Sequence, residues 1–296
     1  MLFRVLRGVG VVDDDGAVTD IAPRKQRALL ALLILNANRI IDGSVLVDSL
    51  WGEALPVHPS AALQVVVSRL RASLGPCGNR VLSEHGGYRL DAGPAEVDVL
   101  RAEALLRDGR AALGNNDGAR AAALFEEALG LWLGDALADL AEFPFVRDAV
   151  RRLHELRFAL LEARNDAYFI DRRHLEVLAD IDSLVASEPL RERLRAQQVV
   201  ALYQAGRQAD ALRAAEALRK ALRDELGVDP STAMQDLERR VLDQDPLLLA
   251  TEAGFMTPLP AWTAEVLPFV GREAELDQVL SYLAQAVDEG IRFVLI

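Results

Sequence analysis

The sequence patterns change character near residue 96, and this change limits the folds open to the chain. Before that point, short strand patterns and helix patterns alternate. From about residue 96 to 246, segments rich in Ala, Leu, Arg and Glu follow one another with helical spacing and without strand patterns. At 296 residues the chain is long enough for about two domains, each with its own core. We therefore expect a mixed domain over 1–93 and an all-α domain over 96–246, which makes the fold class mainly α.

The first 93 residues predict the elements of a winged helix-turn-helix in order. Residues 2–22 predict two short strands joined by the Asp-Gly turn of DDDG. Three helix patterns follow: RKQRALLALLILNAN after Pro23, SVLVDSLWG with Ser44 as its N-cap and Gly52 as its end, and PSAALQVVVSRLRASLG. RVLSEHGGYRLD then predicts a hairpin around a Gly-Gly turn. In this fold the third helix enters the DNA major groove and the hairpin is the wing.

The third helix pattern has an exposed face of unusual composition. Its apolar stripe consists of Leu63, Val66, Val67, Leu70 and Leu74. The opposite face holds Ala61, Val65, Ser68, Arg69 and Ala72, with Gln64 and Arg71 at one margin. A helix that only faces water more often carries Glu and Lys there. The small, basic face with its apolar valine indicates close contact with an anionic surface.

The distribution of charge agrees with a local DNA-binding surface on an acidic protein. A formal net charge of −12 argues against nucleic-acid binding by the chain as a whole. Residues 1–93, however, carry a net charge of +1, and the remainder carries −13. Within 59–90, four arginines oppose Glu84 alone.

The helical region has a weak internal repeat. Gly109, Ala121, Phe125 and Ala128 fall at the spacings of a tetratricopeptide-like helical hairpin of about 34 residues. Val177 and Ala211 are 34 positions apart, and Pro189 ends the second unit. A turn-rich insertion, GDALADLAEFPF, interrupts the pattern. An unrelated helical bundle is the alternative that the pattern leaves open.

The remaining features concern the C-terminal segment and the cellular compartment. Residues 247–268 predict a linker, and 269–296 are too short to form a domain. Cys77 is the only cysteine, which favours a reducing cytoplasm. No signal peptide or membrane-spanning run is evident, so we expect no membrane partner.

The motifs resemble those of a known family. PRKQRALLALLILNANR, LVDSLWGE, LQVVVSRLRASLG and GGYRL look like the DNA-binding domain of Streptomyces antibiotic regulatory protein (SARP) activators, which is similar to the OmpR/PhoB winged helix. DALADLAEFPF and the segment from EPLRERL to DELGVDP resemble the bacterial transcriptional activation domain. LPFVGREAELDQV resembles the entry to the nucleotide-binding ATPase domain of the larger, AfsR-like members, and the phosphate loop that follows it there is absent here, so 269–296 are interpreted as the start of a truncated domain.

The resemblance implies a transcriptional activator and its partners. Such a protein binds double-stranded DNA at promoter direct repeats, as a dimer on DNA, and recruits the RNA polymerase holoenzyme. Two alternatives remain open. In the first, the chain is the N-terminal part of a larger signalling ATPase. In the second, it is a helical-repeat interaction scaffold whose winged helix no longer contacts DNA.

The third helix supplies the first group of candidate DNA contacts. Ala61 and Ala62 permit close approach, and Val65 can contact a thymine methyl group. Arg69 is the candidate for pairing with guanine, Gln64 and Ser68 are weaker base candidates, and Arg71 suits phosphate. The alternative is that both arginines are solubilising charges.

A second group of candidates lies outside the third helix. Arg24, Lys25 and Arg27 cluster at the start of the first long helix, where they suit the sugar-phosphate backbone or a solvated basic turn. In the wing, Tyr88 anchors the hairpin, and Arg80 and Arg89 suit phosphate. Many relatives carry a basic residue where this chain has Glu84, so His85 or Arg89 would have to supply any minor-groove contact.

The sequence has no recognisable pattern of catalytic or metal-binding residues. His58, His85, His154 and His174 are scattered without metal-ligand spacing, and no G-x-S-x-G motif occurs. We therefore expect no enzymatic activity, no cofactor and no metal.

Overall fold

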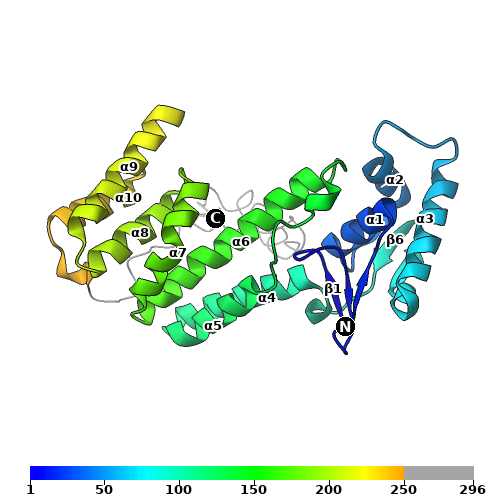
Figure 1. The fold of residues 1–296 in the computed structure, drawn as a ribbon, viewed down its shortest axis with the longest axis horizontal. Coiled ribbons are helices and arrows are strands. Elements are labelled where there is room, and N and C mark those ends of the chain that lie inside the picture. Colours follow the sequence, from blue (N-terminus) through cyan, green and yellow to red (C-terminus); the bar gives the residue numbers. More distant parts are fainter. Residues whose placement is uncertain (250–296) are drawn as a thin grey trace, which may run out of the picture. The chain divides into compact units, whose positions relative to one another are not determined.

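The structure, a computed structural model, describes residues 1–249 (Figure 1). The chain begins with an antiparallel sheet in the order β1 (Leu2–Arg4), β2 (Gly10–Val12), β3 (Val18–Asp20). The Asp13 carboxylate accepts hydrogen bonds from the N–H groups of Asp15 and Ala17, at 3.0 and 2.8 Å, and closes the predicted turn before β3. The sequence predicts one strand before this turn, but there are two, because the chain reverses at Gly8, whose φ is +91°.

Three helices and a second small sheet complete the winged helix. The helices are α1 (Arg24–Leu35), α2 (Gly43–Trp51) and α3 (Pro59–Ser73). The sheet has the order β4 (Ile41–Asp42), β6 (Gly87–Leu90), β5 (Val81–Glu84), and η1 (Gly75–Arg80) joins α3 to β5. The prediction of Ser44 as the N-cap of α2 is wrong. The carboxylate of Asp42 caps this helix by accepting a hydrogen bond from the N–H of Ser44 at 2.8 Å.

The helical part is a succession of helices in which sequence neighbours pack together. They are α4 (Asp98–Gly114), α5 (Gly118–Leu129), α6 (Val146–Ile170), α7 (His174–Ser187), α8 (Glu192–Gln204), α9 (Gln208–Leu226) and α10 (Thr232–Leu242). The most extensive contacts join α4 to α5, α5 to α6, α7 to α8, and α8 to α9. This packing of consecutive helices is typical of a stack of helical hairpins, as the 34-residue spacing predicts.

Gly109 allows α4 and α5 to approach closely. A Cβ atom at this position would lie less than 3 Å from the ring of Phe125, which is fully buried. Ala121 and Ala128 are also fully buried on the same side of α5. The residues that mark the repeat in the sequence are therefore the contact residues of the first helical hairpin.

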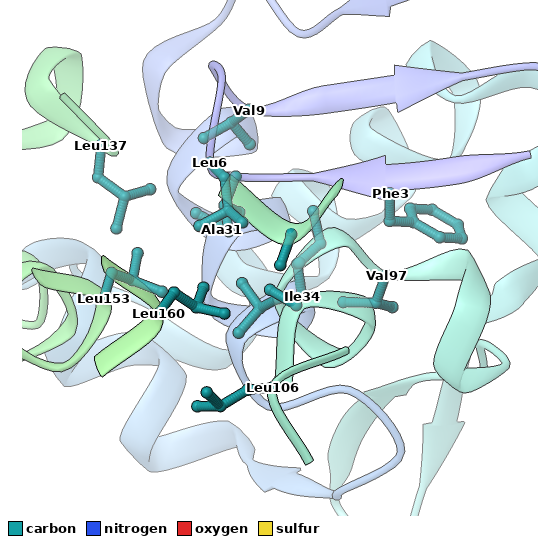
Figure 2. Packing of buried hydrophobic residues seen from close by; sticks show 14 of the residues in the cluster. Phe3, Leu6, Val9, Ala31, Ile34, Val97, Leu106, Leu137, Leu153 and Leu160 are labelled. Carbon is teal, nitrogen blue, oxygen red and sulfur yellow. The ribbon is translucent and has the colours of Figure 1, made fainter. Parts of the chain in front are cut away.

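The turn-rich insertion packs against the winged helix. It contains η3 (Ala138–Leu140), and Leu137 and Leu140 are buried. Leu137, Leu153 and Leu160 belong to the same buried cluster as Leu6 and Ile34 (Figure 2). Residues 1–249 therefore belong to one compact unit, and the apolar core is continuous across the predicted boundary at 93–96.

A buried carboxylate connects the first strand to the first helix of the helical part. One oxygen of Asp98 accepts hydrogen bonds from the N–H groups of Val5 and Leu6 at 2.7 and 2.8 Å, and the other accepts one from Val99 at 2.8 Å. Asp98 is 1% exposed. Burial raises its pKa to about 6, although these three hydrogen bonds act in the opposite direction.

Two remaining sequence expectations concern membranes and the C-terminal segment. Within residues 1–249, no helix combines the length and hydropathy needed to cross a bilayer. The predicted linker over 247–268, apart from its first three residues, and the predicted ATPase fragment over 269–296 lie outside the described residues.

We expect Gly109→Ala to destabilise the protein, because the added methyl group overlaps the Phe125 ring. The loss in unfolding free energy should be about 1–3 kcal/mol, measured by chemical denaturation. Gly114→Ala is the matched control on the same helix, since a Cβ there meets nothing within 4 Å. Equal stability of the two variants would contradict the packing argument.

We expect Asp98→Asn to change the pH dependence of stability. The pKa of Asp98 is higher in the folded protein than in the unfolded chain, so the folded state binds more protons between about pH 4 and 6. Unfolding free energy should therefore fall as pH rises through this window, by up to about 3 kcal/mol, and then level off. Denaturation of both proteins at pH 4, 5, 6 and 7 measures this, and the variant should lack this component. Parallel profiles would contradict the assignment.

Candidate nucleic-acid interface

The face of α3 that points away from the core presents the residues singled out in the sequence. Leu63, Val67 and Leu70 are buried against the winged-helix core. On the other side, Ala61, Gln64, Ser68 and Arg69 are exposed, Ala62 is partly exposed, and Val65 is 48% exposed. The prediction of a core-facing stripe opposite a small, basic face is therefore confirmed.

Arg69 is the arginine of α3 whose charge stays available. Within residues 1–249, its side chain is exposed and makes no hydrogen bond or ion pair with another residue. Arg71, in contrast to Arg69, is half-buried and hydrogen-bonded within the protein. Its Nε and Nη2 atoms donate to the carbonyl oxygen of Val81 at 2.9 and 2.6 Å, and Nη2 also donates to Ser83 Oγ at 2.9 Å. Arg71 therefore holds the wing against α3.

The wing is a tight hairpin whose arginine, Arg89, pairs with neighbouring carboxylates. His85 and Gly86 form the turn, with φ values of +48° and +82°, and His85 is exposed. Arg89 is paired with Glu84, with Nη2 2.7 Å from Oε1, and with Asp91 at 3.0 Å. Hydrogen bonding from Arg89 lowers the pKa of Glu84, so this carboxylate remains charged beside it. The acidic departure from the family pattern thus neutralises a basic residue of the wing.

Two further residues fix the base and body of the wing. Arg80 donates from Nε to the carbonyl oxygen of Asp91 at 2.6 Å and pairs with Glu96. Tyr88 is half-buried and packs against the core, as predicted. A cavity of about 260 Å³ separates the wing from α3 and is lined by Gln64, Ser83, His85 and Tyr88 among others. The structure therefore brings Gln64 of α3 close to the tip of the wing.

Two of the three basic residues at the start of α1 contact the insertion of the helical part. Arg24 Nε lies 3.0 Å from Glu142 Oε1, and Arg27 Nε lies 2.6 Å from Asp139 Oδ2. Lys25 Nζ lies 4.3 Å from the centroid of the Trp51 ring, and burial lowers the pKa of this lysine. Asp139 and Glu142 were not predicted as partners of Arg27 and Arg24, because local sequence patterns do not indicate which distant residues form ion pairs.

Most of the candidate arginines would lose or share an ion pair within the protein if they contacted phosphate. Arg24, Arg27, Arg80 and Arg89 each pair with a carboxylate of the chain. Each would have to exchange or share that partner to reach a phosphate, whereas Arg69 would not. Within residues 1–249 there is also no cluster of three or more metal-ligating side chains.

Two family models match the chain in succession. Residues 21–90 match the model described as "Transcriptional regulatory protein, C terminal", and residues 97–242 match the "Bacterial transcriptional activator domain". These ranges correspond to the winged helix and the helical part.

Individual relatives agree with the two models. The chain is 36% identical over 239 residues to Regulatory protein DnrI of Streptomyces peucetius, which covers 78% of this chain and 88% of that protein. The chain belongs to the SARP/AfsR-like family of transcriptional activators. It is also 40% identical over 278 residues to Regulatory protein AfsR of Streptomyces coelicolor, across 90% of this chain but 28% of that protein. The chain thus spans less than a third of the AfsR proteins that it matches.

A solved structure has the same fold. Mycobacterium tuberculosis EmbR, in complex with a low affinity phosphopeptide, matches with a TM-score of 0.78 and 31% identity. The match covers 84% of this chain and 68% of that chain. A winged helix followed by a helical domain, the fold class predicted from the sequence, is therefore confirmed.

Proposed function

We propose that this protein is a sequence-specific DNA-binding transcriptional activator that reads its operator through α3. The observation that carries the proposal is the exposed face of α3, where Val65 and an unpaired Arg69 stand among small side chains. An α-helix fits the major groove, an arginine can pair with guanine O6 and N7, and an apolar side chain can contact a thymine methyl group. Membership of a family of transcriptional activators supports the same function.

Under this proposal, some candidate residues contact DNA and the others hold the protein's own structure. Arg69, Val65, Gln64 and Ser68 contact base edges, Ala61 and Ala62 permit close approach, and His85 at the tip of the wing contacts the backbone or minor groove. Arg71, Arg80 and Arg89 chiefly position the wing, because their guanidinium groups are engaged within the chain. Arg24 and Arg27 chiefly hold the insertion, and Lys25 lies over Trp51.

The further partners follow from the family resemblance. We propose binding as a dimer to direct repeats at a promoter in the cytoplasm, with the helical domain contacting the RNA polymerase holoenzyme. The net charge of −13 beyond residue 93 supports this division of roles, because an acidic surface is repelled by DNA and remains available to protein partners.

The test is selection of bound fragments from genomic DNA, followed by affinity measurements at several salt concentrations. We expect a repeated motif, and Arg69→Ala should weaken or relax its recognition by about 1–3 kcal/mol. Arg120→Ala is the matched control, an exposed arginine on α5, and should bind like the unmodified protein. Selection of no motif, with only weak and steeply salt-dependent binding, would refute sequence-specific recognition and favour an interaction scaffold.

A second prediction concerns the wing. Glu84→Gln should increase DNA affinity at low salt by about two- to fivefold, because it removes a negative charge and releases Arg89 from one of its carboxylate partners. The slope of log affinity against log salt should steepen by no more than about 0.9, the value for one added phosphate contact. Asp236→Asn on α10, also a carboxylate paired with an arginine, is the control. Unchanged affinity would place the wing away from DNA.

A further inference from the structure

A groove in the helical part carries an arrangement of charge that the DNA-binding proposal does not use. It lies among α7, α8 and α9 and has a volume of about 280 Å³. Its lining includes three arginines, Arg195, Arg207 and Arg213, and two carboxylates, Asp182 and Asp210. The titratable groups that line it therefore sum to about +1, whereas the chain beyond residue 93 is strongly acidic.

Arg195 is half-buried, and the protein only partly compensates its positive charge. Its Nη1 atom donates to Gln198 Oε1 at 2.9 Å, and Gln198 in turn donates to Asp182 Oδ1 at 2.6 Å. The Nε atom is buried and makes no hydrogen bond within the described residues. Burial lowers the pKa of this guanidinium, and the charge of Asp182 offsets this only in part. An anion at the groove would supply the charge compensation that the protein does not provide.

Arg207 and Arg213 present a second cationic position on α9. Both pair with the same carboxylate, with Arg207 Nε 2.8 Å from Asp210 Oδ2 and Arg213 Nη1 2.5 Å from Asp210 Oδ1. Two guanidinium groups sharing one carboxylate leave one positive charge without a counter-charge. Each guanidinium also keeps donors that Asp210 does not occupy.

The remaining lining consists of Gln198 and three apolar residues, Leu178, Leu202 and Ala214. Leu178 is the half-exposed residue of the three, whereas Leu202 and Ala214 are buried beneath the surface. A ligand that suits this lining combines carboxylates with an apolar side chain. The volume accommodates side chains of a peptide.

We propose that this groove binds a protein segment with acidic side chains flanking an apolar residue. Two separate cationic positions suit two side-chain carboxylates better than a single C-terminal carboxylate. The proposal is independent of DNA recognition by α3, because the groove lies wholly within α7–α9 and contains no residue of the winged helix.

The experiment measures peptide binding to the full chain by fluorescence anisotropy. The probe is a labelled peptide with blocked termini in which aspartates flank leucines, and the comparison peptide has asparagines in their place. We expect the aspartate peptide to bind more tightly, with a salt-sensitive Kd. Arg195→Gln should raise the Kd by about fivefold or more, because it removes the half-buried guanidinium.

A second variant should change the Kd in the opposite direction. A gain in affinity cannot result from unfolding, so this variant separates an effect on binding from loss of the fold. Asp210→Asn should lower the Kd several-fold, because it frees Arg207 and Arg213 for the ligand. The matched controls are Arg223→Gln and Asp229→Asn, which alter an exposed ion pair beyond the groove and should leave the Kd within about twofold.

Three results would overturn the proposal. The first is equal affinity for the aspartate and asparagine peptides, and the second is a pair of groove variants that behave like their controls. The third is displacement of the labelled peptide by inorganic phosphate alone, which would show that the groove is a site for small anions. Loss of DNA binding in the Arg69→Ala variant should leave peptide affinity unchanged, so the two proposals can fail separately.

Discussion

The apolar contact between the winged helix and the helical part is the interaction on which the arrangement of residues 1–249 depends. Leu6 and Ile34 from the first part belong to one buried cluster with Leu137, Leu153 and Leu160 from the second (Figure 2). The core is therefore shared, and neither part buries its full apolar surface without the other. Asp98 reinforces the contact, because its carboxylate accepts hydrogen bonds from the chain that follows β1.

This shared core explains why basic residues of the winged helix have different roles. The insertion that supplies Leu137 also carries Asp139 and Glu142, which pair with Arg27 and Arg24. Arg27 is partly buried at the edge of the contact, where a carboxylate partner limits the cost of its burial, and Arg24 pairs at the exposed margin. Arg69, on the opposite surface of α3 from the core, has no such partner within the described residues. Position relative to the core, and not residue type, therefore separates the arginines that pair within the protein from Arg69, which we propose contacts DNA.

Several features were predictable from the sequence because their signals are local. The apolar stripe of α3, the hairpin of the wing, and the repeat marked by Gly109 and Phe125 each follow from the spacing of nearby residues. The turn of the hairpin lies at His85 and Gly86, one position before the predicted Gly-Gly turn, because Gly87 already pairs with Glu84 in the ladder. The errors were also local in origin. Gly8 divides one expected strand into two, and Asp42 precedes Ser44 as the helix cap, since short strands and cap positions leave weak signals.

By itself, the sequence determined the order of helices and strands, the exposed face of α3 and the family, because side-chain periodicity and turn residues act over a few positions. Only the tertiary structure decided which charges remain free. Arg69 and Arg71 lie two positions apart on one helix, yet one is exposed and the other binds the Val81 carbonyl. Likewise, Arg195 lines the same groove as Arg207 and Arg213 only because α8 packs against α9. Ion pairs and grooves join residues that are distant in the chain, so their partners depend on how the apolar faces pack.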